Sequence, residues 1–228
     1  MSRLAVLRHG DDIPLGWFEP GVGVEVDERL LHRGDPLPEP GDHDGVVVLG
    51  GAMGAYDEDR YPWLVDEKRF LTGAVQQDVP VLGVCLGCQL LAEALGGDAF
   101  LADRPEIGVL SMTLTAAGAV DPVVGVFTEP APVWHQDTWT LPPGGTLLAE
   151  TDRFPHAFRL GTALGMQPHA ESGADVIEQW VAHPESADHF ERAGVDPDEF
   201  LDSVRANERV QREMAGAVFA AWLGEVGV

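Results

Sequence analysis

VPVLGVCLGCQLLAEALGG, residues 79–97, is the stretch that decides the fold. A β-branched apolar run leads into Cys85, and a helix-forming segment follows up to Gly96-Gly97. This order predicts a strand, a sharp turn and a helix. Gly83 and Gly87 stand two residues either side of Cys85, as in a nucleophile elbow, where side chains would crowd the turn. The helix dipole would favour a thiolate, the form of cysteine that attacks carbonyls.

Length and charge narrow the class of protein. A chain of 228 residues suits one α/β domain with an appendage, and a hydrophobic content of 45% is ordinary for a globular protein. The 14 Lys and Arg against 38 Asp and Glu give a net charge of −24. So acidic a surface predicts no binding to nucleic acid or to an anionic membrane.

Cysteine usage and the beginning of the chain indicate the compartment. Two cysteines three positions apart do not make a disulfide framework. Arg8 and His9 interrupt the first apolar run, so no signal peptide is expected. The longest uncharged apolar stretch, residues 45–56, is too short to span a bilayer. We therefore expect a soluble, cytoplasmic protein.

The first half of the chain alternates between strand and helix patterns. Strands are expected at residues 4–7, 24–31 and 45–49, and a helix at residues 62–77, before the strand and helix of the elbow. This alternation predicts an α/β fold with a doubly wound, mostly parallel sheet and helices on both faces. Ligands bind such sheets at the carboxyl ends of the strands, where Gly51 and Cys85 both fall.

The second half turns to β-structure and ends in helices. Strands are expected at residues 107–115, 133–141, 145–149 and 157–166, and a helix at residues 172–183.

Asp196, Pro197 and Glu199 form a strong helix start. We expect residues 1–184 to form the α/β domain and residues 185–228 a helical extension packed on it. The apolar stripe of the last helix predicts packing on the body of the protein; a homodimer interface is the alternative.

A nucleophilic cysteine needs a base, and the base needs an orienting group. The best candidates are His169 and Glu171, because residues two apart in extended chain project to the same side. Glu171 could then hold the imidazole of His169 and leave its other nitrogen for Cys85. A His-x-Glu pair is common by chance, and it gains weight only beside the elbow. For the oxyanion, the N–H groups of Leu86 and Gly51 are the natural donors.

Taken together, the elbow, the Gly50-Gly51 loop and the segment Gln167–Glu171 resemble the class I, triad-type glutamine amidotransferases, in particular stand-alone relatives of the GMP synthase glutaminase domain. The resemblance covers about residues 45–175. It implies a flavodoxin-like fold of that family.

By this resemblance Cys85 is the nucleophile, His169 the general base and acid, and Glu171 the orienting carboxylate. Gly51 and Leu86 would form the oxyanion hole, and Gln89 would contact glutamine. The segment from Trp134 to Asp137 looks like the family's histidine-containing loop, which would place His135 beside the substrate.

The chain departs from the family pattern at three positions. Ala52 stands where many members have proline, Ala170 replaces the usual proline between the histidine and the glutamate, and Cys88 stands where histidine is common. None of these removes a catalytic group, although each affects pocket shape or loop rigidity.

The implied reaction is thiolate attack on the side-chain amide of glutamine, release of ammonia and hydrolysis of a γ-glutamyl thioester. The chain carries no recognisable synthetase half, so an ammonia acceptor would be a separate enzyme. One alternative is a γ-glutamyl hydrolase acting on γ-glutamyl amines or peptides. Another is a binding or regulatory protein that has lost turnover.

Other chemistries are less well supported by the sequence. Cys85-x-x-Cys88 has a thioredoxin-like spacing, but the glycine bracket favours an elbow, with Cys88 as a packing residue. No P-loop or dinucleotide fingerprint occurs, so no cofactor is expected. The remaining histidines show no metal-ligand spacing, so we expect no metal and assign them to the surface or the core: His9, His32, His43, His156, His183 and His189. Glu106, before a strand, could be either a pocket residue or a surface carboxylate.

Overall fold

A computed structural model describes residues 2–228. Its centre is an eight-stranded sheet in the order β2-β1-β3-β4-β10-β9-β8-β6. The strands are β1 Ser2–Arg8, β2 Val24–Leu30, β3 Gly45–Val48, β4 Val81–Val84, β6 Thr113–Leu114, β8 Thr146–Glu150, β9 Pro155–Leu160 and β10 Ala163–Met166. The first five in spatial order pair in parallel, and β9, β8 and β6 continue the sheet in antiparallel pairing. The predicted α/β fold with a mostly parallel sheet is confirmed.

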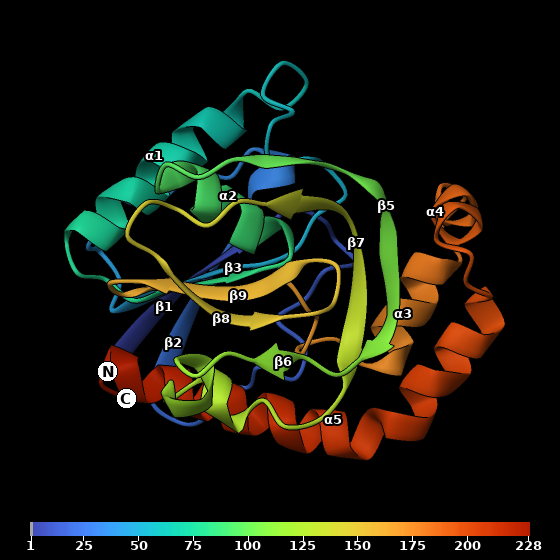
Figure 1. The fold of residues 1–228 in the computed structure, drawn as a ribbon. Helices are drawn as coiled ribbons and strands as arrows, with labels where there is room; N and C mark the ends of the chain where they lie inside the picture. The colour runs from blue at the N-terminus through green and yellow to red at the C-terminus, as the bar shows by residue number, and fades with distance from the viewer. Residues whose placement is uncertain (1) are drawn as a thin grey trace.

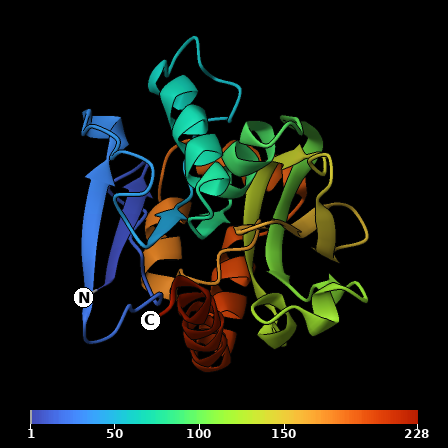
Figure 2. The same ribbon diagram turned by 90° about the vertical axis from the view of Figure 1, so that its left-hand side faces the viewer.

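Helices cover both faces of this sheet (Figures 1 and 2). The helices are α1 Trp63–Gln76, α2 Leu86–Ala94, α3 Ala174–Val181, α4 Ser186–Ala193 and α5 Pro197–Val226. Successive side chains of a strand point to opposite faces. Leu4 and Val6 accordingly pack in one core cluster with Trp222 of α5, whereas Ala5 and Leu7 pack in the other cluster, with α1 and α2.

A separate two-stranded antiparallel sheet stands beside the main one. It pairs β5 Ala99–Leu110 with β7 Ala131–Trp139, with an irregularity between Leu101 and Glu106. The expected strand at residues 107–115 was therefore wrong at its start. Turn residues also divide the expected strand at 157–166: Gly161, at φ 59°, and Thr162 connect β9 to β10 as a hairpin.

The last helix begins as the sequence predicts. The Asp196 side chain accepts hydrogen bonds from the backbone N–H groups of Asp198 and Glu199, at 2.9 and 3.1 Å, and Pro197 is the first helical residue. The predicted apolar stripe is buried within the chain at every position: Phe200, Val204, Met214, Val218 and Trp222. The boundary after residue 184 stays a prediction. No helix in residues 2–228 has both the length and the apolar composition needed to cross a membrane.

A largely buried ion pair ties the end of α5 to the sheet. Arg159 on β9 donates to both carboxylate oxygens of Asp121, at 2.6 and 3.1 Å, and to Glu225 of α5 at 3.0 Å. Burial alone would raise the pKa of Asp121, but the hydrogen bonds from Arg159 and from the backbone lower it. The ionised form of Asp121 therefore stabilises the folded state.

Replacing this carboxylate tests that contribution. Asp121→Asn should lower the free energy of unfolding at pH 7 by about 1–3 kcal/mol, because Arg159 loses its charged partner. The folded pKa of Asp121 is lowered, so its contribution is complete above the ordinary value near 3.8 and is lost as the pH falls through the folded pKa. Urea unfolding of both proteins between pH 7 and pH 3 should show the difference shrinking below about pH 4.

Asp98→Asn is the matched control, since Asp98 is exposed. It should change the free energy of unfolding by less than about 0.5 kcal/mol. A difference for Asp121→Asn that does not depend on pH would contradict the linkage argument.

Candidate active site

Cys85 lies at the abrupt turn between β4 and α2. Its backbone has φ 53° and ψ −108°, and only Asp78 shares a positive φ among the non-glycine residues from 2 to 228. A left-handed conformation at a side-chain-bearing residue costs about 1–3 kcal/mol and persists only where its surroundings enforce it. The Cys85 N–H donates to the Met166 carbonyl of β10 at 2.9 Å, and its carbonyl accepts from Gln89 of α2 at 3.1 Å. These bonds fix the turn on both sides.

The two bracketing glycines allow α2 to start against the sheet. A Cβ atom at Gly87 would lie 2.1 Å from the carbonyl oxygen of Val48, and one at Gly83 would lie 2.4 Å from that of Gly87. Both contacts are with backbone, which cannot rotate away. The glycines are therefore required by close approach, as the elbow interpretation expected.

His169 and Glu171 are bonded to each other in the segment after β10. His169 Nδ1 lies 2.8 Å from Glu171 Oε1, and Ser172 Oγ donates to the same oxygen at 2.9 Å. Glu171 is fully buried and His169 is 4% exposed. The N–H of His169 donates to the Pro132 carbonyl at 2.8 Å, and the Trp180 ring meets the imidazole edge-on at 4.8 Å between centroids. The imidazole is thus held by carboxylate, backbone and aromatic contacts.

The charges around His169 act on its protonation. Burial alone would lower the pKa of its ring, but the neighbouring Cys85 sulfur and the Glu171 carboxylate raise it well above the ordinary value. A protonated imidazole beside the sulfur stabilises a thiolate. The thiol of Cys88 contrasts with this: burial raises its pKa well above the usual value, so it stays protonated within the core.

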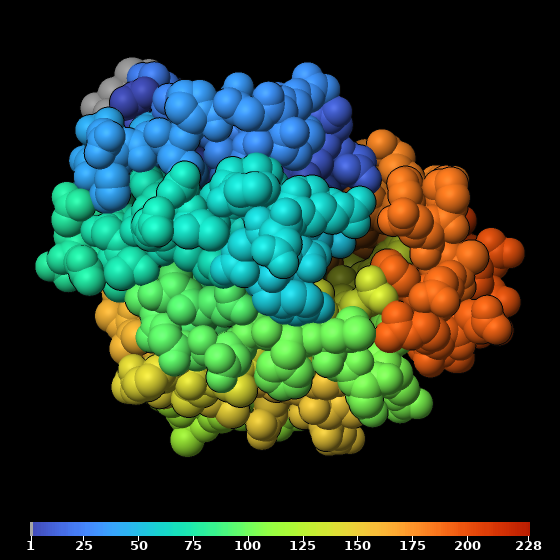
Figure 3. Space-filling view, turned by 90° about the horizontal axis from the view of Figure 1, so that it is seen from above, coloured from blue at the N-terminus to red at the C-terminus, as the bar shows by residue number. Residues whose placement is uncertain are grey.

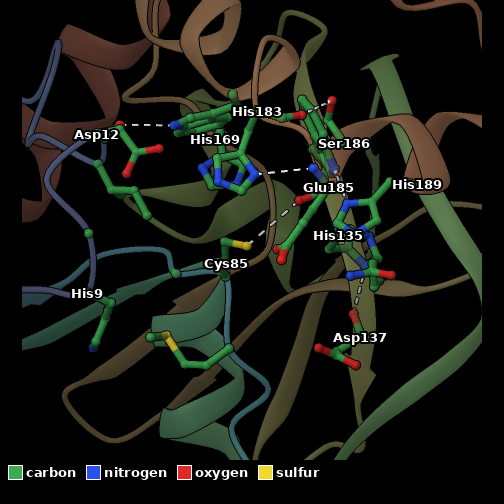
Figure 4. A pocket seen from close by; sticks show the side chains of 18 of the residues that line it. His9, Asp12, Cys85, His135, Asp137, His169, His183, Glu185, Ser186 and His189 are labelled. Atoms are coloured by element: carbon green, nitrogen blue, oxygen red, sulfur yellow. Dashed lines mark hydrogen bonds between the residues drawn. The ribbon is translucent and has the colours of Figure 1, made fainter. Parts of the chain in front are cut away.

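Cys85 and His169 meet at one pocket of about 490 Å³. A Cβ atom at Gly50 would lie 3.1 Å from His169 Cε1 and 3.6 Å from Cys85 Cβ, so Gly50 adjoins both side chains. Figure 4 shows the sulfur below the imidazole. The pocket opens beside the segment that carries α3 and α4, where Figure 3 shows the surface hollowed. Its walls are residues 9–13, 51–53, 85, 89, 134–137 and 169, together with Trp180, His183, Glu185, Ser186 and His189.

The expected oxyanion donors lie on either side of Cys85. Gly51 lines the pocket, and Leu86 is the first residue of α2 with its side chain buried. Neither backbone N–H donates a hydrogen bond within residues 2–228. Both are therefore available to an oxygen that develops negative charge in the pocket.

The two expected substrate contacts also line the pocket, but their polar atoms have partners. Gln89 Nε2 lies 3.3 Å from both the Asp137 carbonyl and Gln167 Oε1. His135 Nδ1 lies 2.7 Å from the same carbonyl. The segment around His135 belongs to strand β7, so the expected loop was wrong at this point.

Behind His135 lies a buried cluster that could hold a metal ion. One ligand atom from each of Glu106, His135 and His156 lies within 4.8 Å of the others. Glu106 Oε2 is 3.2 Å from His135 Nε2 and 2.7 Å from His156 Nε2, and Thr151 Oγ1 donates to Oε1 at 3.0 Å. Burial would raise the pKa of Glu106, but the hydrogen bonds from both histidines lower it. Separations of 29 and 21 residues gave no spacing signal in the sequence.

The model of the family described as glutamine amidotransferase class-I matches residues 24–174. The chain belongs to this family. It is therefore an enzyme of the cysteine-dependent amide hydrolase type.

Curated relatives include a stand-alone amidotransferase-like protein and parts of synthases. The chain is 32% identical to the putative glutamine amidotransferase-like protein YfeJ of Salmonella typhimurium over 177 residues, 74% of each chain. It is 34% identical to one subunit of the glutamine-hydrolyzing GMP synthase of Halobacterium salinarum over 172 residues, 72% of this chain and 77% of the relative. It spans only 31% of the GMP synthase of Thermus thermophilus, at 32% identity over 166 residues.

Solved structures match nearly the whole amidotransferase, including its C-terminal helices. The glutamine amidotransferase of Thermotoga maritima superposes with a TM-score of 0.85 at 27% identity, covering 97% of this chain and 98% of that one. The enzyme of Methylobacillus flagellatus gives 0.86 at 26% identity, covering 99% and 95%. The shared structure thus extends past residue 174, where the family match ends.

The sequence missed part of the pocket. Helix α4 was not expected, and His9, His183 and His189, interpreted as surface or core residues, line the pocket instead. Trp180 lies at the end of a predicted helix, but nothing in its spacing shows that its ring reaches His169. These positions carry no motif, because their roles come from long-range packing.

The close approach at Gly87 gives a structural test of the amidotransferase elbow. Gly87→Ala should destabilise the fold by about 1–3 kcal/mol, because the new methyl group meets the Val48 carbonyl. Gly216→Ala is the matched control: Gly216 lies within α5, and a Cβ there meets nothing within 4 Å. Helix propensity predicts that this control stabilises by about 0.5–1 kcal/mol. Urea unfolding measures both, and equal effects of the two substitutions would contradict the elbow packing.

Proposed function

We propose that this amidotransferase hydrolyses the side-chain amide of L-glutamine to glutamate and ammonia, with Cys85, His169 and Glu171 as its triad. One observation carries the proposal: the His169 ring, bonded to Glu171, stands beside the Cys85 sulfur at the end of a pocket. The raised pKa of His169 supports a thiolate–imidazolium pair.

The chemistry follows from this geometry. The Cys85 thiolate adds to the amide carbon, and the oxygen that becomes negative accepts hydrogen bonds from the N–H groups of Gly51 and Leu86. His169 gives its proton to the leaving nitrogen, so ammonia departs and a γ-glutamyl thioester remains. A water molecule then loses a proton to the same imidazole and attacks the thioester. Glutamate leaves, and the sulfur is free again.

Glu171 would act through His169. Its carboxylate receives the Nδ1 proton, which fixes the ring orientation and leaves Nε2 for proton transfer. Gln89 and His135 would shape the wall that contacts glutamine, since both line the pocket.

We further propose that the ammonia is passed to a separate acceptor enzyme. Relatives in Halobacterium salinarum and Natronomonas pharaonis are named as single subunits of a GMP synthase, and the chain spans only 31% of the full-length synthase of Thermus thermophilus.

Substitution of each cysteine separates the proposed nucleophile from its neighbour. Cys85→Ala should abolish release of ammonia and glutamate from glutamine, a loss of at least about a thousandfold. Cys88→Ala is the matched control, since Cys88 lies three residues on and is fully buried. It should keep activity within about tenfold. Loss in Cys88→Ala with retention in Cys85→Ala would refute the assignment.

A second candidate function is hydrolysis of γ-glutamyl amines. Beyond Cys85 the pocket continues to Trp180, His183, Glu185 and His189, a space that departing ammonia does not need. Carboxylates but no lysine or arginine line it in the described chain, which would suit a cationic amine as the leaving group.

A panel of substrates separates the two functions. Values of kcat/KM for glutamine and for γ-glutamyl derivatives of mono- and diamines should be compared on the same protein. The glutaminase proposal expects glutamine to be best. A preference for the substituted amides of more than about tenfold, reduced by Glu185→Gln, would select the second function. No turnover of any member, with or without ATP and an acceptor synthetase, would favour a binding protein.

A further inference from the structure

A second buried histidine–carboxylate pair lies next to the pocket and has no part in the reaction described above. His9 follows β1, and Glu67 belongs to α1; both side chains are fully buried. His9 Nε2 lies 3.0 and 3.2 Å from the two Glu67 oxygens. The Trp63 ring stacks on the imidazole at 5.6 Å between centroids. Such a pair is too costly to bury without compensation, so its other contacts are informative.

The remaining nitrogen of His9 faces the backbone of the loop after β3. His9 Nδ1 lies 2.9 Å from the Gly50 carbonyl oxygen and 3.1 Å from that of Leu49. Carbonyl oxygens only accept hydrogen bonds, and so does an ionised carboxylate. Both ring nitrogens therefore face acceptors, and the ring satisfies them by carrying a proton on each. Burial lowers the pKa of His9, but the Glu67 charge and the hydrogen bonds raise it overall, in agreement with this charge state.

This contact sets the orientation of one peptide plane. The carbonyl and N–H of a trans peptide point in opposite directions, and no cis peptide occurs in residues 2–228. With the Gly50 carbonyl held toward His9, the Gly51 N–H turns away from it, toward the other side of the loop. That N–H donates to no group in the described part of the chain.

The loop cannot hold this orientation through side chains of its own. A Cβ atom at Gly51 would lie 2.5 Å from Leu86 Cδ2 and 2.9 Å from His9 Cβ, and one at Gly50 would crowd His169. Glycine is therefore needed at both positions, and two successive glycines leave the backbone free to rotate. An external anchor is required.

We propose that His9, held by Glu67, is a positioning residue that fixes the Gly50–Gly51 peptide so that the Gly51 N–H points at the oxyanion formed on Cys85. This inference rests on the proposed function. It adds a role for a residue pair 58 positions apart that touches no substrate.

Kinetics of four variants test the role. His9→Ala should lower kcat for glutamine about a hundredfold with KM changed less than about threefold, because a misplaced oxyanion donor weakens transition-state binding only. Glu67→Gln should lose much less, within about tenfold: a neutral ring can accept from the new amide at Nε2 and still donate from Nδ1. Glu67→Ala, which leaves no such partner, should fall between His9→Ala and Glu67→Gln.

His43→Ala is the matched control. His43 is also buried and lies 2.9 Å from a carboxylate, that of Asp27, but it is outside the pocket. It should lower the free energy of unfolding and leave kcat unchanged. Equal loss of kcat in His9→Ala and His43→Ala would reduce His9 to a structural role and overturn the inference.

A readout without turnover completes the test. In the wild type, ring ¹⁵N shifts of His9 should report two protonated nitrogens at pH 7.5. In His9→Ala, the Gly51 amide resonance should shift and its hydrogen exchange should quicken, while the Leu86 amide stays unchanged. An unchanged Gly51 amide, or an unchanged kcat, overturns the inference and leaves the proposed function intact. An inactive wild type overturns the proposed function and the catalytic role of His9 together.

Discussion

The contact between the start of α2 and the backbone of β3 is the constraint on which the site depends. Because Gly87 has no side chain, the helix begins directly against the Val48 carbonyl, and the chain must reverse within one residue after β4. Cys85 occupies that residue in a left-handed conformation that its neighbours enforce. The sulfur is thereby exposed at the edge of the sheet, next to the positive end of a helix. Strain at one residue is thus converted into a reactive position.

The parallel sheet brings the remaining groups to this edge. The segments after β1, β3 and β10 carry His9, Gly50-Gly51 and His169, and all three strands run parallel to β4. Their carboxyl ends therefore meet at the same side of the sheet, where open α/β folds bind ligands. The wall opposite the sheet comes from α3 and α4, beyond the stretch matched by the family. The reacting groups are thus built by the family's common core, whereas the far wall, which would meet a leaving group, is built by the C-terminal segment.

Three buried histidine–carboxylate groups surround the pocket, and they differ in how they are used. His169 with Glu171 faces the sulfur, His9 with Glu67 faces a peptide plane, and His135 with His156 shares the Glu106 carboxylate behind β7. In each group an ionised acceptor compensates the burial of a ring. The acidic surface, with a net charge of −24, is a separate matter of solubility and says little about these internal charges.

The sequence alone determined the elements whose signals are local. The elbow, the alternation of buried strands with helices, the cap at Asp196 and the His169–Glu171 pair all arise from residues close together in the chain, so spacing and turn chemistry reveal them. Only the tertiary structure decided which distant groups meet. His9 and Glu67, Glu106 and His156, and Trp180 and His169 have separations from 11 to 58 residues that no periodicity records. Their contacts follow from strand order and helix packing, because burial against a shared sheet, and not proximity along the chain, brings them together.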